Sequence, residues 1–284
     1  MLTTSLISKT SDPRCPLIAN DLSQHDFRQI ARWLYEKTGI YMNDSKQPLV
    51  NGRLQKRLRE LQLTNLSAYR KCLMADENEQ QLAINLLTTN ETYFFREPKH
   101  FDFISHELLH AEQKQRGWQV WSAAASSGEE AYSIALLMAE RYGLASSWQI
   151  VGTDINTQVL NTARRGIYPI QAAARIPQNL LKSFCVKGKG KDEGWFMFKP
   201  ALRDHVTFTR YNLINGPGLG QSFDLILLRN VLIYFELADK QRIVQNVLSN
   251  LRPGGWLLVG HSESINGYDP RLQTVRTGCY RFMP

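Results

Sequence analysis

Polar and small residues that follow an apolar strand are the part of this sequence best suited to hold a small ligand. The apolar run from Val120 to Ala123 gives way to the small residues of 124–128, and a helical pattern follows from Ala131. Such a strand, turn and helix N-terminus let the backbone approach a ligand and aim N–H groups at it. Because Gly128 is the only glycine of the turn, G-x-G-x-x-G is absent, and an ordinary tight turn is the alternative interpretation.

The second candidate is the carboxylate of Asp154, which ends the apolar strand expected from Trp148 onward. An acid at the C-terminal end of the second strand of such a fold is placed to accept hydrogen bonds from ribose hydroxyls. Asp154 could instead cap the helix expected over 156–165. Because the strand–turn–helix unit precedes it, we favour the ribose role.

Polar residues also accompany three consecutive aromatic residues at 93–95. Asn90, Thr92 and Arg96 could face a ligand across a junction between domains. The alternative is that the aromatic residues simply pack that junction.

The elements that must position these residues alternate between strands and helices from Trp118 onward, which predicts a parallel sheet covered on both faces. An antiparallel pair is expected to close the sheet within 261–283. The alternation breaks where a small β subdomain is expected at about 185–203. Lysines 187, 189 and 191 lie there, and a solvated turn is favoured over a phosphate site. Strands are expected at 118–123, 148–154, 205–213, 223–228 and 256–260.

The first third of the chain predicts helices with little strand signal. We expect a flexible segment at 1–20, a helical domain at 21–89, a linker and connecting helix at 90–117, and the α/β domain at 118–284. The second helix carries a basic face, which is either a solvated surface or a docking surface for an acidic partner. Its residues are Arg53, Lys56, Arg57 and Arg59.

Bulk composition is that of an ordinary globular protein. The chain has 284 residues, 43% hydrophobic and 21% charged, with a net charge of +8. No apolar run approaches the roughly 18 residues of a membrane span, so no membrane insertion is expected. The cysteines at 15, 72, 185 and 279 lie far apart without C-x-x-C, which favours a reducing cytoplasm over disulfides or zinc. We expect no metal site.

Several of these segments together resemble the CheR family of S-adenosylmethionine-dependent chemotaxis receptor methyltransferases. They occur in the family's order along nearly the whole chain, and the helical N-terminal domain fits as well. The matching segments are Asn90–Arg96, Trp121–Glu130, Thr153–Ile155, Tyr211–Leu213, Leu228–Phe235, Leu251–Gly255 and Gly260–Glu263.

The resemblance implies a class I methyltransferase fold: a Rossmann-like, mostly parallel sheet with a final antiparallel strand, a small helical N-terminal domain and a small inserted β subdomain. It implies methyl transfer from S-adenosylmethionine to glutamate side chains of chemoreceptors, which leaves S-adenosylhomocysteine and a glutamyl methyl ester. The partner would be the receptor's cytoplasmic domain, and in some members also a peptide at the receptor's C-terminus. We expect a cytoplasmic monomer.

The resemblance also implies residue roles. Ala123 and Glu129 would line the methionine end of the cofactor, and Asp154 would hold the ribose. Asn212 and Leu213 would border the adenine. The other cofactor-binding residues would be Asn90, Thr92, Arg96, Arg229 and Asn230, with Arg96 and Tyr234 in catalytic roles. The basic face of the second helix would meet acidic receptor helices.

Two other functions compete with this one. The positive charge permits a nucleic-acid methyltransferase, but the expected strand at 223–228 runs into Arg229-Asn-Val-Leu. That sequence lacks the Asn/Asp-Pro-Pro-aromatic tetrad typical of methylation at base amines, so no nucleic-acid partner is expected. A cofactor-binding protein that has lost catalysis is the other alternative. The intact set of polar residues argues against it.

Overall fold

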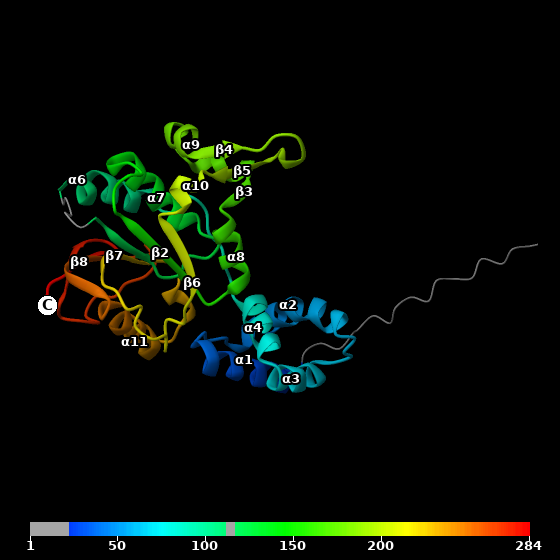
Figure 1. Cartoon of the computed structure of the whole chain (residues 1–284). Coiled ribbons are helices and arrows are strands. Elements are labelled where there is room, and N and C mark those ends of the chain that lie inside the picture. Colours follow the sequence, from blue (N-terminus) through cyan, green and yellow to red (C-terminus); the bar gives the residue numbers. More distant parts are fainter. Residues whose placement is uncertain (1–22, 112–116) are drawn as a thin grey trace, which may run out of the picture.

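The computed structural model describes residues 23–111 and 117–284, so the segment expected to be flexible at 1–20 lies outside the described residues. Figure 1 shows a helical N-terminal domain (blue to cyan) beside an α/β domain, and a small subdomain (green) at the top of the view. None of the described helices has the length and apolar character needed to cross a membrane.

The N-terminal domain consists of four α-helices around one apolar core. Ser23 caps the first helix by accepting a hydrogen bond from the Asp26 amide, and Gly39 ends it in the left-handed conformation, with φ of 73°. Phe27 and Leu34 of this helix are fully buried. The helices are α1 (Gln24–Thr38), α2 (Gln47–Glu60), α3 (Leu66–Ala75) and α4 (Glu77–Leu87), with a 3₁₀ turn at Asp44–Lys46.

A connecting helix leads to the α/β domain. It begins as α5 (Pro98–Phe103), passes through a π-helical turn at Ile104–Leu108 and ends as α6 (Leu109–Ala111) within the described residues. The sequence places a linker and connecting helix at 90–117, of which 112–116 lie outside the described residues.

The α/β domain is built on a seven-stranded sheet with the order β6-β2-β1-β7-β8-β10-β9. The first five of these strands pair in parallel, and β10 pairs antiparallel with both β8 and β9. The Rossmann-like fold expected from the sequence, with its closing antiparallel pair, is therefore confirmed. The strands are β1 (Gln119–Ser122), β2 (Gln149–Asp154), β6 (Val206–Arg210), β7 (Phe223–Leu228), β8 (Leu251–Val259), β9 (Leu272–Arg276) and β10 (Cys279–Phe282).

Helices cover both faces of the sheet. Successive strand residues point to opposite sides, so each face presents its own apolar side chains to a covering helix. Val120 belongs to the core under α7 (Glu129–Tyr142), and Trp121 belongs to the core under α11 (Leu237–Leu248). Strand β7 is buried along its whole length, as expected of a central strand. Helix α8 (Thr157–Arg165) follows β2 and begins at a cap formed by Asn156.

The inserted subdomain is a three-stranded antiparallel sheet with the order β3-β5-β4. Its first strand, β3 (Ile167–Pro169), lies before the range expected from the sequence; β4 is Cys185–Lys187 and β5 is Trp195–Phe198. Phe94 packs into its core, with ring centroids 5.0 Å from Tyr168 and 5.7 Å from Phe198. The short helices α9 (Gln178–Phe184) and α10 (Pro200–Arg203) flank it, with 3₁₀ turns at Ile170–Arg175 and Gly190–Asp192.

The basic face of α2 is partly used inside the helical domain. Arg53 donates to the carbonyl oxygens of Leu87 and Thr88, at 2.7 and 3.1 Å. Arg57 pairs with the buried carboxylate of Glu79 at 2.5 Å. Lys56 and Arg59 remain exposed, so the docking hypothesis narrows to these two side chains.

The Arg57–Glu79 pair gives a prediction about stability and pH. The hydrogen bond from Arg57 holds the pKa of Glu79 below its ordinary value, although burial opposes this. A carboxyl whose pKa is lowered by folding stabilises the protein above its unfolded pKa of about 4.3, and this contribution is lost as the pH falls. Glu79→Gln should therefore reduce the free energy of unfolding by about 2 kcal/mol at neutral pH.

Urea unfolding of wild type and variant at neutral pH and at about pH 4 measures this difference, which should shrink at the lower pH. Glu60→Gln is the matched control, because Glu60 meets the same Arg57 on the exposed side. It should change stability little. An equal loss in the two variants, or a Glu79→Gln loss that grows at low pH, would contradict the assignment.

Candidate active site

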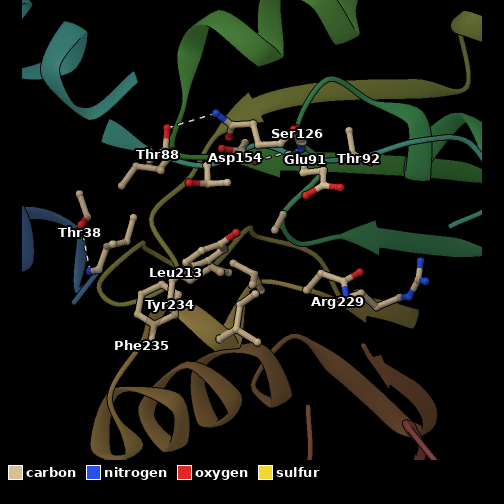
Figure 2. Close-up of a pocket in the computed structure, with 18 of the residues that line it drawn as sticks. Thr38, Thr88, Glu91, Thr92, Ser126, Asp154, Leu213, Arg229, Tyr234 and Phe235 are labelled. Atoms are coloured by element: carbon tan, nitrogen blue, oxygen red, sulfur yellow. Dashed lines mark hydrogen bonds between the residues drawn. The ribbon is translucent and has the colours of Figure 1, made fainter. Parts of the chain in front are cut away.

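A cavity of about 440 Å³ lies where the helical domain meets the carboxyl ends of the parallel strands, within the size range of small-molecule sites. Thr38, Tyr41 and Thr88 line it from the helical domain, and Asp154 and Tyr234 line it from the α/β domain (Figure 2). In folds of this class, ligands bind at this end of the sheet.

Asp154 is held in place by the backbone around it. One carboxylate oxygen accepts a hydrogen bond from the Ser126 amide at 2.9 Å (Figure 2). The other accepts one from the Asn156 amide, also at 2.9 Å. Burial raises the pKa of this carboxyl. Asn156, not Asp154, caps α8 through its own side chain. The capping role considered for Asp154 is therefore wrong, and its carboxylate lines the cavity.

The turn from β1 to α7 brings backbone to the cavity beside Asp154. The Ala123 amide donates to the carbonyl of Leu227, and the Ala125 amide to that of Thr153, both at 2.8 Å. Gly128 has a φ of 99°, and a Cβ there would lie 2.9 Å from both the Ala163 Cβ of α8 and the Tyr168 hydroxyl of the subdomain. The left-handed backbone and this close packing together explain the one glycine of the turn.

A buried ion-pair network forms the opposite end of the cavity. Arg229, whose side chain is 1% exposed, pairs with Glu130 at 2.8 Å and with Glu97 at 3.0 Å. Glu130 also accepts a hydrogen bond from Ser122 at 2.7 Å, and burial raises the pKa of its carboxyl. Because two acids already engage Arg229, this guanidinium positions other groups more than it binds a ligand directly.

Glu129 is not among the residues that line the cavity, whereas Glu130 is. The Glu129 carboxylate instead accepts a hydrogen bond from Ser127 at 2.7 Å. The two glutamates are adjacent at the start of α7, and a helix turns successive side chains about 100° apart. Glu130 is therefore a cavity-lining residue that the sequence did not single out.

The segment at 90–96 supplies polar groups from the junction between the domains. The Asn90 carbonyl accepts a hydrogen bond from Ser126 at 3.1 Å. Arg96 lines the cavity and donates to the Glu91 carbonyl at 2.6 Å. Because no carboxylate partner of Arg96 is found within the described ranges, its guanidinium is available to a ligand.

The two domains are also joined by hydrogen bonds beside the cavity. Asn212 donates from its side chain to the Lys37 carbonyl at 2.9 Å, and the Tyr41 amide donates to the Tyr234 carbonyl at 2.9 Å. Burial raises the pKa of Tyr234, so its hydroxyl stays protonated near neutral pH. Asn230 has a φ of 55°, and its backbone N–H donates a hydrogen bond to the Glu263 carboxylate at 2.6 Å.

The structure thus brings together all the predicted cofactor and catalytic residues except Glu129. The residues found in the cavity lining are Asn90, Thr92, Arg96, Ala123, Asp154, Asn212, Leu213, Arg229, Asn230 and Tyr234. Sequence reasoning also missed Thr38 and Tyr41 of the helical domain, which join the site only because α1 ends beside Tyr234.

Comparison with known protein families gives two matches along the chain. Residues 90–280 match the family model described as the CheR methyltransferase SAM binding domain. Residues 25–88 match the CheR methyltransferase all-alpha domain. Together the two matches span both domains described above.

Curated proteins are similar over most of their length. The chain is 39% identical to a chemotaxis protein methyltransferase of Salmonella typhimurium, over 89% of this chain and 90% of that protein. It is 39% identical to chemotaxis protein methyltransferase 2 of Pseudomonas aeruginosa, over 90% of this chain and 93% of that protein. It is 38% identical to the chemotaxis protein methyltransferase of Escherichia coli, over 88% of each chain.

Proposed function

The chain belongs to the CheR methyltransferase family and uses S-adenosylmethionine, and we propose that it methylates glutamate side chains in the cytoplasmic domain of chemoreceptors. The product would be a glutamyl methyl ester. The observation that carries the proposal is the cavity itself, with Asp154 at one end and Glu130 beside Arg229 at the other. Relatives named as chemotaxis protein methyltransferases support the receptor as substrate.

The residues present fit S-adenosylmethionine. Asp154 is placed to accept hydrogen bonds from ribose hydroxyls, since the Ser126 and Asn156 amides hold its carboxylate at the cavity wall. Glu130 provides an acceptor for the ammonium group, and Arg96 a donor for the carboxylate. Leu213, on the wall formed by the segment after β6, is placed to border the adenine.

When bound, S-adenosylmethionine supplies an electrophilic methyl group for an in-line displacement. A glutamate side chain has a pKa of about 4.3, so the nucleophile is ionised near neutral pH and no general base is required. The protein's work is to orient the carboxylate and exclude water. The absence of a His–Asp base pair in the cavity lining is consistent with this chemistry.

Two residues are proposed to act at the reacting groups. Tyr234, protonated and half-buried in the cavity wall, would shape the methyl pocket and donate a hydrogen bond. Arg96 would orient the cofactor's carboxylate. If Arg96 instead bound the receptor glutamate tightly, it would lower the reactivity of that glutamate's carboxylate. Arg229 cannot take this role easily, because Glu97 and Glu130 hold it.

The receptor is proposed to dock beside the cavity on the helical domain. Lys56 and Arg59 are exposed on α2, where an acidic helix could meet them. We propose that one copy of the chain suffices, since both domains that line the cavity come from the same chain.

Methyl transfer to a purified chemoreceptor cytoplasmic fragment tests the function. With methyl-labelled S-adenosylmethionine, the fragment should acquire label that mild alkali releases, and peptide mass spectrometry should place the added methyl groups on glutamates. Run with and without the receptor's C-terminal tail, the assay also shows whether that peptide contributes. Alkali-stable label, or label on added RNA or DNA and none on the receptor, would contradict the proposal.

Glu130→Gln should weaken S-adenosylmethionine binding by tenfold or more, because a hydrogen bond between charged groups contributes about 1.5–3 kcal/mol. Burial raises the pKa of Glu130, so in the wild type this contribution should fade as the pH drops through that raised value. The variant should lack this decline, because an amide does not titrate. Calorimetry at several pH values measures both effects.

Glu129→Gln is the matched control. It removes the same charge one residue earlier, but Glu129 faces Ser127 outside the cavity lining. Its affinity should stay near that of the wild type. If Glu129→Gln weakened binding more than Glu130→Gln did, the ammonium would belong to Glu129 after all.

A further inference from the structure

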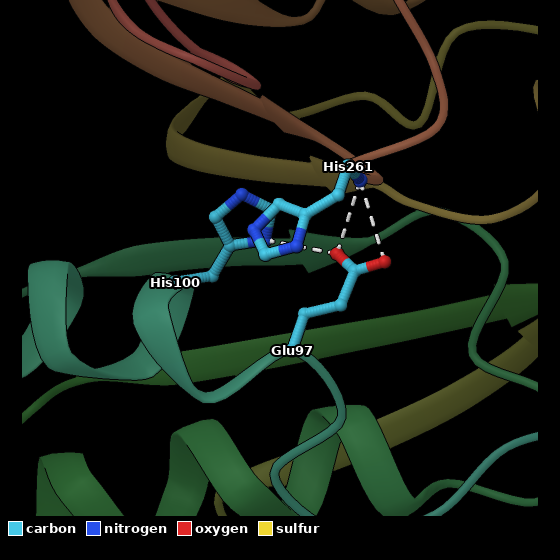
Figure 3. A group of neighbouring side chains, drawn as sticks. All are labelled: Glu97, His100 and His261. Atoms are coloured by element: carbon cyan, nitrogen blue, oxygen red, sulfur yellow. Dashed lines mark hydrogen bonds and ion pairs between the residues drawn. The ribbon is translucent and has the colours of Figure 1, made fainter.

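Two histidines and a glutamate meet beside Arg229. The glutamate, Glu97, pairs with Arg229, which also pairs with Glu130 of the cofactor cavity. Glu97 immediately precedes α5, His100 lies in its first turn, and His261 comes two residues after the end of β8. One ligand-type atom of each, a ring nitrogen or a carboxylate oxygen, lies within 4.8 Å of the other two (Figure 3). None of the three lines the cofactor cavity.

His100 is the unexplained member of this group. It is 2% exposed, and neither ring nitrogen has a hydrogen-bond partner among the described residues. Its Nδ1 lies 3.3 Å from a carboxylate oxygen of Glu97, without the alignment of a hydrogen bond. Leaving a buried polar atom unsatisfied costs about 1–3 kcal/mol. A metal ion that accepts the lone pair of a His100 ring nitrogen would remove this cost.

The charges around the cluster suit a cation. The neutral imidazole is the form of histidine that binds metals. Glu97 and Glu130 share the single guanidinium of Arg229, so these three groups carry one excess negative charge when both acids are ionised. A cation beside Glu97 would balance it.

Access and support for a bound ion are also present. A second cavity, of about 540 Å³, is lined by His100 and His261, and His261 is exposed there. Asn230 donates to one oxygen of Glu97 at 3.0 Å, and Arg229 donates to the other. The His261 amide also donates to both Glu97 oxygens, at 3.3 and 3.2 Å. Such outer contacts fix the orientation of a ligating carboxylate.

We propose that Glu97, His100 and His261 form a site for one divalent transition-metal ion of the zinc class. Two imidazoles and a carboxylate are a typical ligand set for zinc, with a fourth position open to water. Ligands about 2.0–2.2 Å from zinc stand roughly 3.4 Å apart, so the three atoms must close by about 1.4 Å at most. The exposed His261 side chain can provide that movement.

The probe is Zn²⁺ added to chelator-treated full-length protein. Calorimetry should show one saturable site per chain, and Zn²⁺ should raise the unfolding temperature because it binds the folded state. Co²⁺ in its place should give the absorption of a four-coordinate site without bands from thiolate ligation.

His261→Ala is the informative variant, because His261 is exposed and its removal should leave the fold intact. Zn²⁺ affinity should fall at least tenfold. His110→Ala, which removes an exposed histidine of α6 outside the cluster, is the matched control and should bind as the wild type does. Absence of saturable binding to the wild type overturns the proposal, as does binding that His261→Ala leaves unchanged or that shows thiolate bands. All these readouts are independent of methyl transfer.

Discussion

Asp154→Ala is expected to weaken S-adenosylmethionine binding about a hundredfold, the largest loss of affinity from any single side chain of the site. Two backbone amides hold the carboxylate in position before any ligand arrives, so ribose hydroxyls meet an acceptor that needs no reordering. Two hydrogen bonds to a charged group contribute roughly 3 kcal/mol together. Calorimetry with S-adenosylhomocysteine measures the change without turnover.

The variant also removes two local hydrogen bonds, so a matched loss elsewhere is needed for comparison. Asp76→Ala serves, because Asp76 caps α4 by accepting the Asn78 amide, far from the cavity lining. It should lower stability modestly and leave cofactor affinity unchanged. Unchanged affinity in Asp154→Ala, with the fold intact, would remove the ribose assignment.

Arg229→Ala is expected to have the largest effect on stability. Its side chain is 1% exposed, and its loss leaves the carboxylates of Glu97 and Glu130 without their cation. Breaking a buried pair in this way costs about 3–5 kcal/mol, which corresponds to a fall of about 10 °C in the unfolding midpoint. Differential scanning calorimetry measures it directly.

Arg229→Lys should recover only part of the loss, because an ammonium cannot reproduce the fork with which Arg229 reaches two acids. Arg32→Ala is the control for removing an arginine from an ion pair. Its side chain is 76% exposed beside Glu36, so the midpoint should hardly move. Equal shifts in Arg229→Ala and Arg32→Ala would show that the buried network contributes nothing.

Much of the fold could be predicted because its signals are local. Ser23 and Gly39 bound α1 as a cap and a stop residue should, and the nearly continuous apolar run of β7 is that of a central strand. Asp154 could be placed because a strand end fixes where its last side chain must lie. The role of Asn156 as the cap of α8 could not be separated from Asp154, since both precede the helix by only a few residues.

The missed features depend on contacts distant in sequence. The carbonyl groups that end α4 orient Arg53, and Glu79 of α4 orients Arg57. The charge pattern of α2 alone therefore does not reveal either orientation. Glu130 was missed because only the packing of α7 on the sheet decides which of two adjacent glutamates faces the cavity. Glu97, His100 and His261 were missed because the third member lies on a distant strand end.

The most direct test of the central claim is an experimental structure with S-adenosylhomocysteine bound. We predict density in the cavity between the helical domain and the sheet. The ribose hydroxyls should lie within hydrogen-bond distance of Asp154, and the amino-acid end should lie beside Glu130 and Arg96. Density at another place, or a cofactor in this cavity with its ribose directed away from Asp154, would contradict the account.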